Sequence, residues 1–191
     1  MHPKLTPERL ARMRVVVFPL PDTKIHAVQH FWLRRFPIEN VFIVPKIQTM
    51  ITCTRNIYLM DCAKLTDRFD EFVFIDGDVV PTNQTEGFWD SDDDVVCCKA
   101  EMPSNHTAWS SPMAWHDPLW RCKGSVLNRV QLPYYEYVLN NTGTKEIHCI
   151  CMGFAEKCRK AGFSVGVSGE CGHENIGTWQ STGCKHIDFG E

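Results

Sequence analysis

The hydrophobic residues of the first hundred positions fall into short apolar runs, separated by longer segments in which they recur every three to four residues. The runs predict strands, because they are rich in β-branched and aromatic residues and end near proline or glycine. The predicted strands span residues 15–18, 41–44, 72–75 and 95–99, and the predicted helices span residues 6–12, 22–35 and 54–65. Strands that alternate with helices favour parallel βαβ units. The sequence therefore predicts an α/β fold, Rossmann-like, with a mostly parallel central sheet flanked by helices.

Apolar residues at helical spacing also predict the buried face of each longer helix. The predicted inward-facing residues are Ile25, Val28, Phe31 and Trp32 in the first, and Ile57, Met60 and Leu65 in the second.

The second half of the chain has a less regular pattern. Residues 102–141 combine many aromatic residues with prolines, which favours an irregular region with at most a short helix near its end. Its aromatic residues include Trp109, Trp115, Trp120, Tyr134, Tyr135 and Tyr137. We expect at least half of these rings to fill the core, and the others could stack on a substrate. A last helix is predicted over residues 146–161, a last strand over 163–167, and a loop from Gly169 onward.

Length and charge restrict the class of protein. A chain of 191 residues with 43% hydrophobic content suits one folded domain. A net charge of −3 gives no polybasic field, so broad electrostatic binding to nucleic acid is not expected. Residues 1–14 lack the apolar core of a signal peptide, and no apolar run approaches the ~20 residues that cross a bilayer. We therefore expect a soluble protein with no membrane span, located in the cytoplasm, or in the host cytoplasm if its source is a virus.

The segment from Phe72 to Pro81 carries the strongest chemical signal. Its apolar run, typical of a central parallel strand, stops at two aspartates, Asp76 and Asp78, which one glycine separates. In open α/β sheets, ligands bind at the carboxyl ends of the strands. Two carboxylates freed from strand alternation by a glycine turn can both approach one hard divalent cation. The alternative is an ordinary turn after a strand, because Asp-Gly is common there.

Three features of the chain resemble small GT-A-type glycosyltransferases of bacteria and phages. Thr54-Arg55-Asn56 opens a helix about twenty residues before the acidic pair, and the segment from Phe74 to Pro81 resembles the D-x-D strand end of the family. The third feature is a helix that ends in Ala161-Gly162 and leads to a strand and then to Cys171-Gly-His173. The match covers roughly residues 14–176. It implies one GT-A domain over residues 1–191, with a nucleotide-binding half at about 14–100 and an acceptor half at about 101–191.

The resemblance implies a role for each residue of the motif. Asp78 is expected to bind a metal ion directly, Asp76 to contact the ribose of the donor or the metal, and His173 to supply a third metal ligand. The expected ion is Mn²⁺ or Mg²⁺, since both accept oxygen ligands and Mn²⁺ better tolerates an imidazole. The expected donor is a nucleoside-diphosphate sugar, with a UDP-sugar as the leading candidate.

Three further residues are candidates for binding the donor. Arg55 could supply a fixed cation near the nucleotide, and Pro19 ends the first strand at the same predicted edge. Asn56 stands beside Arg55 at the start of the helix. The alternatives are that Arg55 is a surface arginine and that Asn56 caps the helix.

The sequence departs from the family at the general base. Many inverting members carry an acidic pair just before the phenylalanine of the last helix. Here that phenylalanine is Phe154, and the corresponding residues, Ile150 and Cys151, have no carboxylate. Glu146 and Asp117 are the remaining candidates, so inversion, retention, a substrate-derived base or a weakened enzyme are all open. The acceptor is equally open: a polysaccharide, a protein, a small molecule or a modified DNA base.

The ten cysteines support a different reading. We expect Cys53, Cys62, Cys97 and Cys98 to be buried thiols, because they lie in apolar segments. The cysteines and histidines near the end could instead hold a structural Zn²⁺. These are Cys149, Cys151, Cys158, Cys171, His173, Cys184 and His186. The chain would then be a zinc-stabilised or non-catalytic binding module on a decayed transferase fold.

A third reading is a phosphatase or nucleotidyl-type enzyme that uses Asp76 and Asp78. The acidic run of Asp90 and Asp92 to Asp94 could add metal ligands. A solvated turn before the strand at Val95 explains the same run more simply.

Overall fold

The computed structural model describes most of the chain, and the description below applies to that part. The described residues are 2–19, 25, 27–45, 51–101, 118–136, 138–139, 146–148 and 150–173. Within them, the side chains of Glu146 and His173 lie outside the described part. No helix among these residues is long and apolar enough to cross a membrane.

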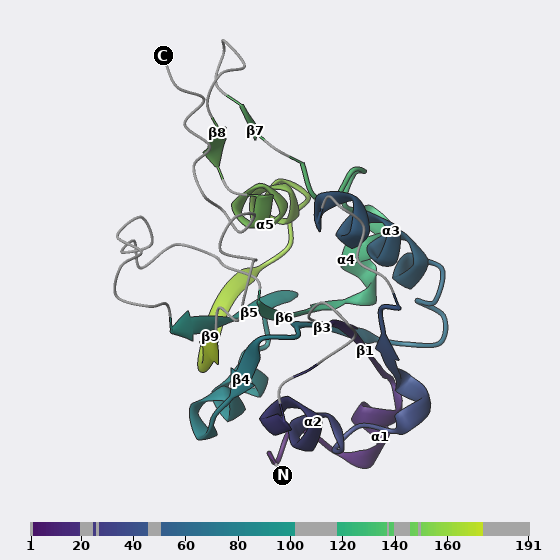
Figure 1. Cartoon of the computed structure of the whole chain (residues 1–191). Coiled ribbons are helices and arrows are strands. Elements are labelled where there is room, and N and C mark those ends of the chain that lie inside the picture. The colour runs from purple at the N-terminus through teal and green to yellow at the C-terminus, as the bar shows by residue number, and fades with distance from the viewer. Residues whose placement is uncertain are drawn as a thin grey trace.

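A seven-stranded sheet forms the centre of the molecule (Figure 1). Its strands are β1 (Met13–Phe18), β2 (Val41–Ile43), β3 (Glu71–Asp76), β4 (Val79–Pro81), β5 (Val95–Glu101), β6 (Leu119–Lys123) and β9 (Val165–His173). Their order is β2-β1-β3-β6-β5-β9-β4. The helices are α1 (Pro7–Ala11), α2 (Ala27–Leu33), α3 (Ile51–Ala63), α4 (Gly124–Arg129) and α5 (Ile150–Lys160), with 3₁₀ segments η2 (Ile38–Asn40) and η3 (Asn83–Trp89).

Most strands of this sheet run in one direction. β1 is parallel to β2 and β3, and β5 is parallel to β9. β6 is antiparallel to both β3 and β5, and β4 is antiparallel to β9. Five strands therefore share one direction, and β6 and β4 oppose them. The predicted mostly parallel α/β sheet is confirmed, and the carboxyl ends of β1, β3, β5 and β9 lie at one edge, called here the carboxyl edge.

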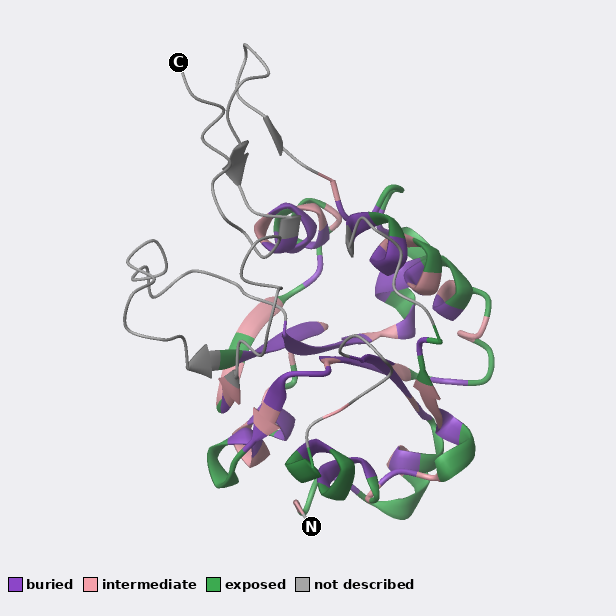
Figure 2. Cartoon of the chain, in the orientation of Figure 1, coloured by how far each residue is buried: buried purple, intermediate pink, exposed green. Residues whose placement is uncertain are grey.

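Two hydrophobic clusters cover the two faces of the sheet (Figure 2). Side chains of β3 alternate between them, as the pleat requires. Phe72 and Phe74 pack with α3, α4 and α5 on one face, whereas Val73 and Ile75 pack with α1, α2 and η3 on the other. Trp120 stacks on Phe74 at a centroid distance of 4.2 Å and is 1% exposed. The prediction that such rings fill the core is confirmed for Trp120.

The predicted faces of the two longer helices were wrong at four of the seven residues, whereas Ile25 and Leu65 pack against the core as expected. In α2, Trp32 is buried as expected, but Val28 is 41% and Phe31 67% exposed. In α3, Ile57 and Met60 are also more than two-fifths exposed. The inward residues include polar side chains instead: Gln29 in α2, and Thr52, Thr54 and Arg55 in α3. In both helices, polar contacts decide which side faces the core. The spacing of hydrophobic residues carries no information about such contacts.

The second half of the chain is more regular than predicted. β6 and α4 lie in the region expected to be irregular, and β9 continues to His173 where a loop was expected after Gly169. The last helix begins at Ile150, not at Glu146. Glu146 belongs to β8 (Glu146–His148), which pairs with β7 (Val138–Leu139), because Glu-Ile-His alternates polar and apolar residues as a strand does.

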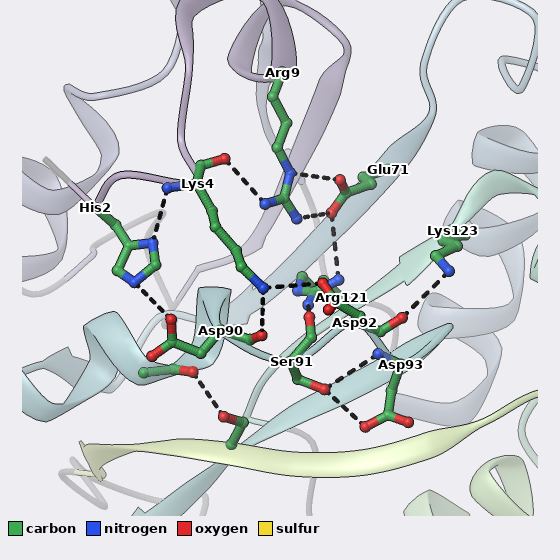
Figure 3. A network of polar contacts seen from close by, with 12 residues as sticks. His2, Lys4, Arg9, Glu71, Asp90, Ser91, Asp92, Asp93, Arg121 and Lys123 are labelled. Atoms are coloured by element: carbon green, nitrogen blue, oxygen red, sulfur yellow. Dashed lines mark hydrogen bonds and ion pairs between the residues drawn. The ribbon is translucent and has the colours of Figure 1, made fainter.

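A polar network closes the opposite, amino edge of the sheet (Figure 3). Glu71, the first residue of β3, pairs with Arg9 at 2.7 Å and with the buried Arg121 at 3.4 Å. Lys4 pairs with Asp92, and Lys123 pairs with Asp94. These basic residues belong to α1, to β6 and to the segment before α1, so the network joins distant parts of the chain.

The position of this network corrects one part of the phosphatase-type reading, the metal ligands expected from the acidic run. Asp90, Asp92 and Asp94 lie just before β5, at its amino end. Asp76 lies at the carboxyl end of β3, which runs in the same direction as β5. The acidic run and the aspartate pair are therefore at opposite edges of the sheet, and the run cannot add ligands to a site at Asp76 and Asp78.

Candidate functional site

The turn that carries the aspartate pair is held by backbone hydrogen bonds from both neighbouring strands. The amide of Gly77 donates to the carbonyl of Phe18 at 2.7 Å, and the amide of Asp76 donates to the carbonyl of Pro118 at 2.8 Å. Phe18 ends β1, and Pro118 precedes β6. The turn is thus fixed at the carboxyl edge, with the buried Pro19 next to Phe18.

Arg55 and Asp76 form an ion pair at this edge. Nη2 of Arg55 lies 2.9 Å from Oδ2 and 3.2 Å from Oδ1 of Asp76. The Arg55 side chain is 5% exposed and that of Asp76 is 22% exposed, so solvent screens the pair only partly. The guanidinium also lies 5.4 Å from the Tyr135 ring and 5.9 Å from the Phe18 ring. The alternative of a surface arginine is therefore wrong.

Gln29 holds the same turn from the other face of the sheet. Its side chain is fully buried, and Nε2 donates to the backbone carbonyl of Asp76 at 2.7 Å. A buried glutamine on a helix is costly unless it is hydrogen-bonded, so this contact explains why Gln29 faces inward. Sequence reasoning missed Gln29. Its position three residues before Trp32, on the helix face that Trp32 buries, was the available signal.

Asn56 clamps the segment that follows α4. Its Nδ2 donates to the carbonyl of Tyr135 and its Oδ1 accepts from the amide of Tyr135, both at 2.8 Å. The predicted alternative of an N-cap is wrong, because α3 begins at Ile51 and Asn56 lies inside it. Asn56 instead fixes the residue whose ring lies beside Arg55. Tyr135 was missed as a member of this site.

Asp78 immediately precedes β4, and β4 pairs with β9 from the C-terminal part of the chain. The residue is 7% exposed, so its carboxylate lies in a largely desolvated place. β4 pairs with β9 so that Val79 is directly opposite His173. The backbone of His173 is therefore next to the residue that follows Asp78, although 95 positions separate His173 from Asp78 in sequence. The register agrees with the position predicted for His173; its role as a ligand stays a prediction.

The described residues fit a hard divalent cation in part. Carboxylate oxygens suit Mn²⁺ and Mg²⁺, and Asp78 offers such oxygens beside the backbone of a histidine. The carboxylate of Asp76 already has a cation, Arg55. Among the side chains that the structure describes, no group of three or more His, Cys, Asp or Glu residues is arranged to hold a metal. Asp78 is therefore one candidate ligand, and a metal held by Asp78 and Asp76 stays a prediction.

The two candidates for the general base have different surroundings. Asp117 lies outside the described residues, but the next residue, Pro118, accepts the hydrogen bond from Asp76. Glu146 lies in the separate two-stranded sheet, whose strand β8 contacts α5. Trp109, Trp115 and Tyr137 also lie outside the described residues.

All the cysteines of the described part except Cys53 are buried in the core rather than gathered around a centre. Cys151 and Cys158 belong to the cluster on the α5 face, whereas Cys171 belongs to the cluster on the other face. Burial raises the pKa of Cys158 to about 12, which disfavours the thiolate that zinc requires. Cys62, Cys97 and Cys98 are buried as predicted, but Cys53 is exposed. The other proposed zinc ligands, Cys149, Cys184 and His186, lie outside the described residues.

Comparison with known proteins bears on the fold. No protein-family profile matches the chain, and no curated protein sequence matches it. A197 from STIV aligns with a TM-score of 0.50 and 15% sequence identity, over 84% of this chain and 81% of that protein. The chain therefore has a fold similar to that of A197.

Two further solved structures align more weakly. A glycosyltransferase involved in the glycosylation of the major capsid of PBCV-1 has a TM-score of 0.41 and 12% identity, over 64% of this chain and 69% of that one. A protein of Desulfovibrio desulfuricans G20, inferred to be a nucleotide-diphospho-sugar transferase, has a TM-score of 0.43 and 11% identity, over 87% and 64%. Both TM-scores are below 0.5, so neither alignment supports a conclusion about the fold or function of this chain.

Proposed function

We propose that this protein is a metal-dependent glycosyltransferase that takes its sugar from a nucleoside-diphosphate sugar. One observation supports this proposal most directly. The carboxyl edge of the sheet brings together the Arg55–Asp76 ion pair, the buried Asp78 and the backbone of His173. These are the residues that the resemblance to GT-A-type transferases assigns to the donor and its metal.

Each of these residues has a distinct task in the proposal. Asp78 holds Mn²⁺ or Mg²⁺ together with His173, and the bound ion stabilises the negative charge of the diphosphate leaving group. Asp76, oriented by Arg55, accepts a hydrogen bond from the ribose of the donor or adds an oxygen to the metal. Arg55 contributes a fixed positive charge, and Asn56 and Pro19 shape the same edge. UDP-sugars are the leading donors.

For the general base we favour Asp117 over Glu146. Asp117 precedes Pro118, whose carbonyl is bonded to the amide of Asp76. Glu146 lies on a strand of the separate two-stranded sheet. If Asp117 is the base, Asp117→Asn abolishes sugar transfer but retains donor binding, and Glu146→Gln keeps full transfer. The opposite pattern would assign the base to Glu146.

A thermal-shift panel tests the donor site. UDP, GDP, CDP and TDP are each added with and without Mn²⁺, with a chelator as control. A ligand at ~100 times its Kd stabilises the native state by about 2.7 kcal/mol. We expect one nucleotide to raise the melting temperature of the wild type only when Mn²⁺ is present.

Two variants make this test specific. Asp78→Ala removes the proposed metal ligand, and Asp61→Asn removes the same charge from the exposed surface of α3. The nucleotide shift should vanish in the first variant and persist in the second. A response that survives Asp78→Ala would sink the metal assignment. Melting on chelation alone, with no response to any nucleotide, would favour a zinc-stabilised binding module.

A further inference from the structure

Two threonines at the start of η3 hold the strand that ends at His173. Thr85 Oγ1 accepts from the amide of Thr82 at 2.9 Å and donates to the carbonyl of Glu170 at 2.8 Å. Thr82 Oγ1 donates to the same carbonyl at 3.1 Å. Thr85 is fully buried, whereas Thr82 is exposed. The buried hydroxyl therefore joins η3 to β9 where solvent cannot replace it.

Neighbouring residues of β9 tighten the same junction. Ser168 Oγ donates to the carbonyl of Gly87 at 2.7 Å. Gly169 has φ +77°, and a Cβ there would lie 2.6 Å from the amide nitrogen of Phe88. Only glycine allows η3 and β9 to approach this closely. Three consecutive residues of β9, from Ser168 to Glu170, are thus anchored to η3.

The anchored residues of β9 are close in sequence to His173, and β4, which pairs with β9, directly follows Asp78. Thr82 immediately follows β4, and Glu170 lies three residues before His173, the last residue of β9. Pro81 pairs with Cys171 and Val79 pairs with His173. A shift of β9 by one residue would turn His173 to the other face of the sheet, since strand side chains alternate. The contacts of η3 with Glu170 therefore help to fix where the backbone of His173 lies relative to Asp78.

We infer that Thr85 is a positioning residue for the metal site: its buried hydroxyl fixes the register of β9 on β4. This inference rests on the proposed function, in which Asp78 and His173 hold the metal. Thr85 does not touch that site itself. It acts through the carbonyl of Glu170, three residues before His173.

Matched variants separate positioning from general stability. Thr85→Val keeps the shape of the side chain and removes the hydroxyl, and Thr85→Ser restores it. Val126→Ala destabilises the opposite face of the sheet through a buried residue of α4, in a different cluster from Phe88 and Trp89 of η3. Mn²⁺ binding is measured by electron paramagnetic resonance without nucleotide, and amide hydrogen exchange is measured for residues 79–81 and 171–173.

We expect Thr85→Val to weaken Mn²⁺ binding by at most about 10-fold, the lower end of the effect of losing an outer-shell partner, because Thr85 acts on His173 only through the strand. The same variant should accelerate amide exchange in both segments, Thr85→Ser should restore both properties, and Val126→Ala should leave Mn²⁺ affinity unchanged. Unchanged exchange in Thr85→Val overturns the role in register. Faster exchange with wild-type Mn²⁺ affinity overturns the role in positioning.

A further comparison distinguishes failure of this inference from failure of the proposed function. Asp78→Ala is titrated with Mn²⁺ beside the wild type. If Asp78→Ala and the wild type bind Mn²⁺ equally well, Asp78 is not a metal ligand. The proposed function then fails, and so does the role of Thr85 in positioning. If only the wild type binds, the proposed site stands, and the Thr85 variants decide the inference by themselves.

Discussion

Arg55 donates to both carboxylate oxygens of Asp76 through a single nitrogen, Nη2, from a side chain that is 5% exposed. The pair joins α3 to the end of β3. Because the ion pair is mostly buried, removing one partner leaves an uncompensated charge in a poorly solvated place.

The first prediction concerns this pair. Arg55→Met should lower the free energy of unfolding by about 2 kcal/mol, because a hydrogen-bonded carboxylate loses its charged partner. Adding Asp76→Asn should recover part of that loss, since no unpaired charge is left. Urea unfolding of the two single variants and the double variant measures the coupling. Strictly additive losses would show that the pair does not stabilise the fold.

The second prediction concerns the clamp between Asn56 and Tyr135. Asn56→Ala leaves the amide and the carbonyl of Tyr135 without their partners, which should cost about 2 kcal/mol. Asn128→Ala is the control, since Asn128 donates only to Thr66 at an exposed position and should change stability by less than about 0.5 kcal/mol. Equal melting temperatures for the two variants would contradict a specific role for Asn56.

Much of the central sheet could be predicted from local sequence. The segment 72–75 is apolar at every position and ends at a glycine turn, so its burial between two layers follows from hydrophobicity alone. The same reasoning placed the first two strands and the carboxyl edge, and thereby the position of Asp76. These features depend on residues that are close in sequence, and the hydrophobic pattern reflects those residues directly.

The errors occur where a polar residue faces inward because of a distant partner. Gln29 turns α2 so that Phe31 faces solvent, and the reason is the carbonyl of Asp76, which is 47 positions away. Arg121 is tolerated in the buried strand β6 because Glu71 pairs with its charge and the carbonyl of Ser91 accepts from its Nη2, contacts that are 50 and 30 positions away. A hydrophobic pattern has no information about such contacts.

The third prediction compares two glycines with positive φ. Gly162 has φ +85° and open space where a Cβ would lie, whereas Gly169 has φ +77° and faces the backbone of Phe88. Gly162→Ala should cost about 1–2 kcal/mol, the strain of a left-handed conformation. Gly169→Ala should cost about 1–3 kcal/mol more, because η3 and β9 must separate.

Chemical denaturation of both alanine variants measures this difference. A similar loss in the two variants would mean that η3 moves away from β9 without cost. The contact between η3 and β9 would then be too soft to fix the register of β9.

The last prediction concerns acid stability. A hydrogen bond from Lys123 lowers the pKa of Asp94, burial opposes this shift, and hydrogen bonds from the backbone and hydroxyl of Ser164 add to the lowering. A carboxyl with a lower pKa in the folded state stabilises the fold above its unfolded pKa of about 3.9. That stabilisation is lost as the pH falls through the folded pKa.

Asp94→Asn should therefore reduce stability at pH 7, by up to about 1 kcal/mol for a partly exposed pair. The difference between the variant and the wild type should shrink as the pH falls below about 4, where the wild-type carboxyl also becomes neutral. Urea unfolding between pH 7 and pH 2 measures the difference. Lys123→Met should reproduce part of the effect, because Lys123 is the largest cause of the shift. A difference that stays constant over this range would show that Asp94 acts by its shape and not by its charge.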